Sequence, residues 1–274
     1  MPFSTGASCK TIANSAFYGC KALIAITLPE GLTAIGESAF YNCSSVVSAL
    51  IPSTVTTIGR SAFYNSAKGI IFSEGIKKIP DSACDGANTL EKVSIPSGVE
   101  EIGDRAFASL KCKEINLPET LKTLGSYVFD DSDLQKVTIP SSLKTAGNQI
   151  LTNCKYVEEL NINCPLKAFG EYDFFSYYTD SNVSSYGKKL VINTAEPLYP
   201  FKYISTMMAF DKVIINEPCS SSDFNMKNGT SDMEQRGFQN IYYEIKDNTI
   251  SFEYVADVSY KNGKSSLVEL NFKK

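Results

Sequence analysis

One string of residues recurs along the first two thirds of the chain at a nearly fixed spacing. It is clearest at residues 35–43, Ile-Gly-Glu-Ser-Ala-Phe-Tyr-Asn-Cys, and returns in altered form before and after that range. Its phenylalanine position steps by 21 to 23 residues and is held in turn by Phe17, Phe40, Phe63, Cys84, Phe107, Phe129, Leu151 and Phe174. A fixed period of about 20 to 30 residues predicts a solenoid, in which each coil buries its apolar edge on its neighbours.

Each repeat contains a segment with the pattern of a strand. Residues 90–96 and 134–140 follow the form Leu-x-x-Ile-x-Ile-Pro, with Val for the first Ile. Alternating apolar and polar residues indicate a half-buried strand, and proline ends it because it has no N–H to donate. We expect one parallel strand per coil, near 23–28, 46–51, 67–72, 90–95, 112–117, 134–139, 157–162, 187–192 and 210–215. The Gly and the Ala-Phe pair that follow predict a short helical or irregular turn.

The repeat decays toward the C-terminus. An insertion near 175–186 breaks the register, and the Met-rich, aromatic segment 200–210 is compatible with a helix. Residues 219–237 are rich in Ser, Asn, Asp and Gly, which is typical of a linker or loop. Beyond them, three alternating segments predict an antiparallel β meander. We therefore expect a solenoid of about nine coils in 1–218, and a small β cap or separate module in 238–274.

The repeat resembles the BspA-like (treponema-type) leucine-rich repeat, whose unit reads roughly L-x-x-I-x-I-P-x-x-L-x-x-I-G-x-x-A-F-x-x-C. The similarity covers residues 12–175 and recurs about seven times. It implies a leucine-rich-repeat solenoid of the α/β repeat class, rich in β-structure, with a parallel strand ladder and short helical turns. The family occurs largely in surface proteins of host-associated bacteria and some parasitic protists. The resemblance therefore implies a cell-surface or secreted protein, active in adhesion or in binding a protein or glycan that can be host-derived.

The composition limits the partners that the chain can take. Its net charge is −4, whereas a nucleic-acid-binding surface is strongly basic, so we expect no nucleic-acid partner. No apolar run reaches the ~18 residues that would predict a membrane span. No charged segment followed by an apolar one stands after Met1, so no secretory signal is visible. Both an extracellular or surface location and a cytoplasmic one therefore stay open, and the residues indicate no oligomeric state.

The residue types also limit the chemistry. The chain has no histidine, which removes Ser-His-Asp sites, Cys-His sites and every histidine-bearing metal site. Its cysteines lack the close pairing of a four-Cys zinc site, and we expect no metal and no cofactor. Cys20, Cys43 and Cys154 share one position of the repeat, which favours buried free thiols, although the spacing of coils does not exclude a bridge between Cys20 and Cys43.

Paired carboxylates are the remaining catalytic possibility, because a glycosidase needs only two acids at a set separation. The candidates are Asp130, Asp131, Asp133, Glu158 and Glu159. All of them fall at positions of the repeat that are expected to face solvent, where a charge needs no catalytic reason. We therefore predict that the protein is not an enzyme, and a carboxylate-pair hydrolase is the alternative.

The outward positions of the strand ladder are the main candidate for a binding surface. Side chains of a strand alternate between its faces, so the residues between the inward apolar ones should stack into a concave polar face. Its members are Glu91, Lys92, Ser94, Lys113, Glu114, Asn116, Gln135, Lys136, Thr138, Glu158, Glu159 and Asn161. A structural spacer would carry the same polar face simply to stay soluble. A second candidate is an aromatic patch at Tyr177 and Tyr178, which are the members of a local aromatic cluster that we expect to be exposed.

Overall fold

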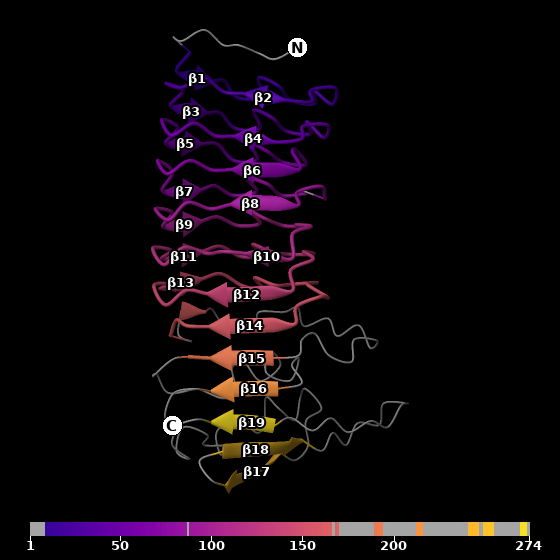
Figure 1. The fold of residues 1–274 in the computed structure, drawn as a ribbon, viewed down its shortest axis with the longest axis vertical. Helices are drawn as coiled ribbons and strands as arrows, with labels where there is room; N and C mark the ends of the chain where they lie inside the picture. Colours follow the sequence, from indigo (N-terminus) through magenta and orange to yellow (C-terminus); the bar gives the residue numbers. More distant parts are fainter. Residues whose placement is uncertain are drawn as a thin grey trace.

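The computed structural model describes residues 9–86, 88–165, 168–169, 189–193, 212–215, 241–246, 249–254 and 269–272. Coils of nearly equal length stack along one axis, and strands of successive coils lie side by side (Figure 1). The stacking follows from the period of the sequence, because equal coils place equivalent residues above one another. The predicted solenoid with a parallel strand ladder is confirmed.

Ladder A, as we call it, contains one strand at each of the nine predicted positions. Its strands are β2 (Ile26–Thr27), β4 (Ala49–Leu50), β6 (Gly69–Ile71), β8 (Lys92–Ser94), β10 (Glu114–Ile115), β12 (Lys136–Ile139), β14 (Glu159–Ile162), β15 (Lys189–Ile192) and β16 (Lys212–Ile215). Neighbouring strands pair in parallel and in repeat register, as where Lys136 lies opposite Glu159. The ladder divides into two sheets, because β8 and β10 are not paired with each other.

A second ladder, ladder B, runs along the other edge of the coils and was not predicted. It consists of β1 (Thr11–Ile12), β3 (Ala34–Ile35), β5 (Thr57–Ile58), β7 (Lys78–Ile79), β9 (Glu101–Ile102), β11 (Thr123–Leu124) and β13 (Thr145–Ala146). All its pairs are parallel, and it divides between β5 and β7. Each strand has only two residues, so no alternating pattern can be recognised in its sequence.

The turn from ladder B to ladder A is not helical, which corrects the expectation of short helical turns. The described part of the chain contains no α-helix. Within the turn, Ser38 and Asn42 have left-handed backbones, with φ of 53° and 58°. Such residues interrupt a right-handed helix. Every second N–H group instead bonds to the next coil, as where Phe40 N donates to Ala62 O at 2.8 Å, and those between bond within the turn, as where Tyr41 N donates to Ser38 O at 3.1 Å. The turns therefore form a further set of hydrogen bonds between coils.

Glycine opens most of the turns, with Ala13 and Pro80 as exceptions, because two coils approach closely there. A Cβ added to Gly125 would lie 2.5 Å from the backbone N of Asp104 in the preceding coil. The same two coils are joined next to this contact by a hydrogen bond from Ser126 N to Asp104 Oδ1, 2.7 Å long. A side chain at the glycine would push the coils apart. The glycine column therefore sets the distance between neighbouring coils.

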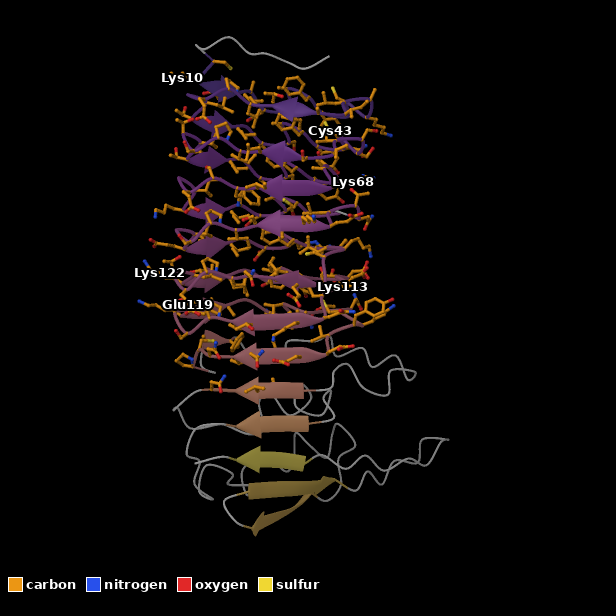
Figure 2. All side chains as sticks on the ribbon, in the orientation of Figure 1. Lys10, Cys43, Lys68, Lys113, Glu119 and Lys122 are labelled. Atoms are coloured by element: carbon orange, nitrogen blue, oxygen red, sulfur yellow. The ribbon has the colours of Figure 1, made fainter. Side chains whose placement is uncertain are left out.

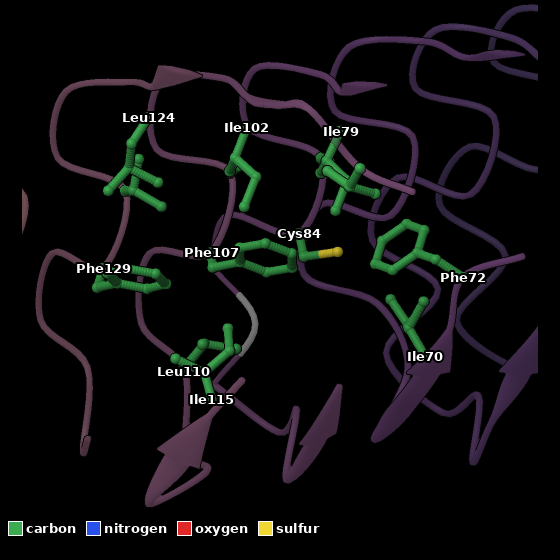
Figure 3. Packing of buried hydrophobic residues seen from close by; sticks show 14 of the residues in the cluster. Ile70, Phe72, Ile79, Cys84, Ile102, Phe107, Leu110, Ile115, Leu124 and Phe129 are labelled. Carbon is green, nitrogen blue, oxygen red and sulfur yellow. The ribbon is translucent and has the colours of Figure 1, made fainter. Parts of the chain in front are cut away.

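The repeated phenylalanines form a row inside the solenoid. Phe17, Phe40 and Phe63 are stacked, with ring centroids 5.1 and 5.4 Å apart. Cys84 interrupts the row, and Phe72 packs edge-on against Phe107 at 6.3 Å near this gap (Figure 3). The core around the row is apolar and buried, and includes Ile and Leu residues from both ladders. Each coil is thus stabilised mainly by its two neighbours.

Two buried cysteines in the repeat column do more than fill space. The Cys43 and Cys154 thiols lie 3.0 and 2.9 Å from the carbonyl oxygens of Phe17 and Phe129 in the preceding coils, as donors. Ser132 makes the equivalent bond to Phe107 O at 3.3 Å, which explains why serine can replace cysteine there. Burial raises the pKa of Cys43 to about 11 and that of Cys154 to about 12. The cysteines of the described part are free thiols.

The C-terminal strands differ from the predicted meander. Strands β17 (Ile241–Lys246) and β18 (Thr249–Tyr254) do form an antiparallel pair. Strand β19 (Glu269–Phe272), however, pairs in parallel with β16 and so extends ladder A. Alternation of apolar residues indicated that β19 is a strand but could not indicate its neighbour. The predicted linker and the possible helix lie outside the described residues, and the domain boundaries stay predictions.

Candidate binding face

All twelve predicted face residues lie in or beside the strands of ladder A. None of them is buried, and eight are exposed: Glu91, Lys92, Ser94, Lys113, Glu114, Asn116, Lys136 and Glu158. The pairing of the strands brings equivalent residues together, so that Glu114, Lys136 and Glu159 follow one another along the stack. Inward residues of the same strands, such as Val137, are fully buried. Strands β12 and β14 alternate accessible and buried side chains, whereas residues just before them, such as Gln135, do not follow this alternation. Binding by this face stays a prediction.

The predicted face is not carried by one unbroken sheet. Its first three members belong to the coil of β8, and the other nine lie on the coils of β10, β12 and β14, across the break in ladder A. A single backbone bond from Lys111 N to Leu90 O, 3.1 Å long, lies beside the break. The nine residues after the break form the more regular part of the face.

Charges of both signs interact along this part of the face. Lys136 Nζ lies 3.5 Å from Glu159 Oε1, and Asn161 donates to the same carboxylate at 2.8 Å. Asn161 also lies 3.5 Å from Thr138 Oγ1 in the preceding coil. Exposed ion pairs of this kind contribute only about 0–1 kcal/mol each. They cost little to exchange for contacts with a partner, and their mixed signs do not select a partner of one charge.

The first three coils carry an apolar surface that the sequence analysis missed. Ile24, Val47, Leu50 and Ile71 are 65, 57, 62 and 52 % exposed. They occupy the repeat positions that Glu91 and Ser94 hold in the coil of β8, because Leu50 pairs with Ile71 and Ile71 with Ser94. We call these four residues the apolar patch. A comparison of outward positions coil by coil would have revealed it, since the polar pattern begins only at residue 91.

The candidate catalytic carboxylates are largely held by cations or amides. Asp130 Oδ2 lies 2.9 Å from Arg105 Nη1, and Arg105 Nε lies 3.1 Å from Asp85 in the opposite direction along the stack. Asp133 lies 3.1 Å from Lys111. The described part contains no cluster of Cys, Asp and Glu that could hold a metal ion. These acids therefore join neighbouring coils, and the arrangement favours a structural role for them.

Aromatic side chains form a stack at the turns of the first coils. The rings of Tyr18, Tyr41 and Tyr64 are parallel, with centroids 4.7 and 4.4 Å apart. Desolvation raises the pKa of Tyr41, and its neighbouring tyrosines add to the increase. The rings cover one another, so mainly their edges are accessible. The predicted aromatic patch at Tyr177 and Tyr178 lies outside the described residues.

Figure 2 shows the charged side chains pointing away from the stack along both edges of the coils. Lys68 and Lys113 mark the side of ladder A, whereas Lys10, Glu119 and Lys122 mark the opposite side. Within the described residues, no helix is both long and apolar enough to cross a membrane. The molecule thus offers strand faces and turns to solvent on both sides of the stack.

A solved structure of a bacterial leucine-rich repeat protein shares this fold. A leucine-rich repeat protein from Bacteroides ovatus has a TM-score of 0.50 at 18 % identity, over 81 % of this chain and 63 % of its own. The pneumococcal vaccine antigen PcpA gives 0.49 at 18 %, over 86 and 64 %. A leucine-rich cell surface protein from Faecalibacterium prausnitzii gives 0.40 at 17 %, over 81 and 87 %. The chain spans less than two thirds of the first two proteins, and no curated protein matches it.

A family model settles the classification. The model of the BspA type leucine rich repeat region matches six copies, over residues 3–112 and 77–186. These ranges contain the described coils from β1 to β14 and cover more than half of the chain. The predicted resemblance is confirmed: the chain belongs to the BspA-type leucine-rich repeat family.

Proposed function

We propose that this protein is a non-enzymatic, cell-surface or secreted binding protein that presents the outward face of ladder A to a protein or glycan, in adhesion to a host or matrix component. The observation that carries the proposal is the common register of accessible polar side chains over the coils of β10 to β14. Such a face can follow an extended partner along several coils. Proteins of this family are typically associated with bacterial surfaces, which supports the location.

A structural spacer is the second candidate. It is favoured by the contacts that the face residues make among themselves, as between Lys136 and Glu159. A surface that needs only to be soluble would satisfy its polar groups in this way. The acids discussed above are mostly engaged between coils, so a carboxylate-pair hydrolase receives less support.

The two candidates differ in their response to charge reversal on the face. We would combine Lys92→Glu, Lys136→Glu and Glu158→Lys and measure capture by immobilised extracellular-matrix proteins and by a glycan array. A binding face predicts at least a tenfold loss of capture without loss of the circular dichroism spectrum. If the protein is a spacer, neither the unaltered protein nor the triple variant should be captured.

A matched control reverses the same charges elsewhere. Lys77, Lys144 and Glu37 are exposed and lie beside ladder B, and Lys77→Glu, Lys144→Glu and Glu37→Lys leave the net charge of the two triple variants equal. Capture by the control variant should equal that of the unaltered protein. An equal loss in both variants would contradict a role for the ladder A face.

A further inference from the structure

The apolar patch covers two columns of ladder A, where a column is the set of equivalent outward positions in successive coils. In both columns apolar residues stand where later coils carry polar ones. Along the first column, Ile24 and Val47 precede Lys68 and Glu91, and along the second, Leu50 and Ile71 precede Ser94. Between the columns lie small residues, namely Ala25, Ser48 and Gly69. Four of the seven large apolar side chains that are exposed in the described part belong to this patch. Scattered apolar residues need no explanation, but a contiguous group on one face marks an interaction site.

The strand segments of the patch carry charges of one sign, whereas an acid, Glu91, lies just beyond them in the next coil. In the strand segments 20–29, 43–52 and 66–73, the charged residues are Lys21 and Lys68. Both are exposed, and in the described part of the chain neither forms a salt bridge. Glu91 follows Lys68 in its column but does not reach it within 4.0 Å. A partner that covers the patch would therefore gain by placing carboxylates beside its own apolar side chains.

We propose that the first three coils bind a protein segment that combines apolar side chains with acidic ones, seated on Ile24, Val47, Leu50 and Ile71 with its carboxylates at Lys21 and Lys68. The inference rests on the proposed function in taking ladder A as the binding face, and it specifies a protein rather than a glycan. Aliphatic side chains offer no hydrogen bonds to sugar hydroxyls. The apolar patch supplies the buried anchor that interfaces need at their centre, and the polar residues of later coils supply the rim.

Two other occupants fit the patch less well. Anionic membranes are recognised by clusters of about four to eight basic residues, whereas the strand segments of the patch offer only two. A second copy related by two-fold symmetry would bring the same patch and the same lysines to the interface. The lysines of both copies would then lie at an interface whose strand segments contribute no acid. An acidic, apolar segment satisfies both features of the surface.

The test uses the full chain and three labelled peptides of equal length, with binding followed by fluorescence anisotropy. One peptide alternates Leu and Asp, the second carries Lys in place of Asp, and the third carries Ser in place of Leu. We expect the Leu/Asp peptide to bind at least tenfold more tightly than either of the others. Lys68→Glu should weaken its binding severalfold, and added salt should weaken it as well. Equal affinity for the Leu/Asp and Leu/Lys peptides would overturn the proposal.

Variants of the patch locate the binding. Leu50→Asn combined with Ile71→Asn should weaken binding of the Leu/Asp peptide at least tenfold, whereas Tyr156→Ser, at an equally exposed apolar residue in the coil of β14, should leave it unchanged. If the double variant unfolds, Lys68→Glu alone decides. A variant of the more distant polar face, Lys136→Glu with Glu158→Lys, leaves Lys92 beside the patch intact and should retain the peptide, so that failure of the two proposals can be told apart. Binding to phosphatidylserine vesicles, or a dimer in sedimentation, that the patch variants abolish would refute the acidic segment as occupant.

Discussion

The row of phenylalanines allows a quantitative test of how the coils stabilise one another. Phe40 is 1 % exposed and is stacked on both sides, by Phe17 at 5.1 Å and by Phe63 at 5.4 Å. Phe40→Leu keeps a large apolar side chain but removes both ring contacts. Aromatic pairs contribute about 0.5–1.5 kcal/mol beyond burial, so the two contacts predict a loss of about 1–3 kcal/mol in the free energy of unfolding. Phe40→Ala, which also leaves a cavity, should cost about 3–5 kcal/mol.

The matched control is Phe129→Leu. Phe129 has one stacked partner, Phe107, at the longer distance of 6.4 Å, and the next coil already carries Leu151 in this column. We expect a loss of about 1 kcal/mol or less, measured with Phe40→Leu by urea-induced unfolding followed by circular dichroism. A double-mutant cycle with Phe63→Leu should give a coupling energy of about 0.5–1.5 kcal/mol. If Phe40→Leu costs no more than Phe129→Leu, stacking between coils does not stabilise the solenoid as we have reasoned.

Two further predictions concern the spacing of coils and the buried thiols. Gly125→Ala should lower the melting temperature, because its Cβ would lie 2.5 Å from a backbone N. Gly69→Ala, whose Cβ would have its nearest atom at 3.8 Å, should change the melting temperature little. Equal effects of the two variants would show that the close approach of the coils does not matter. Cys20 is exposed, so a thiol reagent at pH 8 should modify it in seconds to minutes. Cys154, whose pKa burial raises to about 12, stays protonated at that pH and should react only on unfolding, as mass spectrometry of labelled peptides would show. Rapid labelling of Cys154 in the folded protein would contradict its burial.

The sequence predicted those parts of the fold that recur with a recognisable pattern. The phenylalanine spacing predicted the stack, and segments such as 90–96 predicted every strand of ladder A from β2 to β16. Ladder B was missed because two-residue strands have no period to detect. The sequence did not distinguish a helical turn from an irregular one, because the Ala-Phe pair is compatible with both. In the structure the left-handed backbones of Ser38 and Asn42 make the turn irregular.

The candidate site was predicted only in part. Polar residues from Glu91 onward are accessible in the structure, whereas their role as a binding face stays a prediction. The apolar patch was missed because Ile24 and Leu50 fit the general expectation that apolar residues are buried, and only the register of the ladder shows that they face outward. The neighbour of β19 could not be predicted, because pairing between distant segments depends on the path of the chain between them.

The two ladders are interrupted at different levels of the stack. Ladder B is open between β5 and β7, and there the turns still join the coils, as where Phe63 N donates to Ala83 O at 2.9 Å. Ladder A is open between β8 and β10, where β7 and β9 remain paired. The two gaps in strand pairing therefore lie between different pairs of coils, and no two neighbouring coils from β1 to β14 lack pairing in both ladders. A pulling force along the axis would therefore act on hydrogen bonds between every neighbouring pair of these coils. We expect the stack to resist separation at either gap.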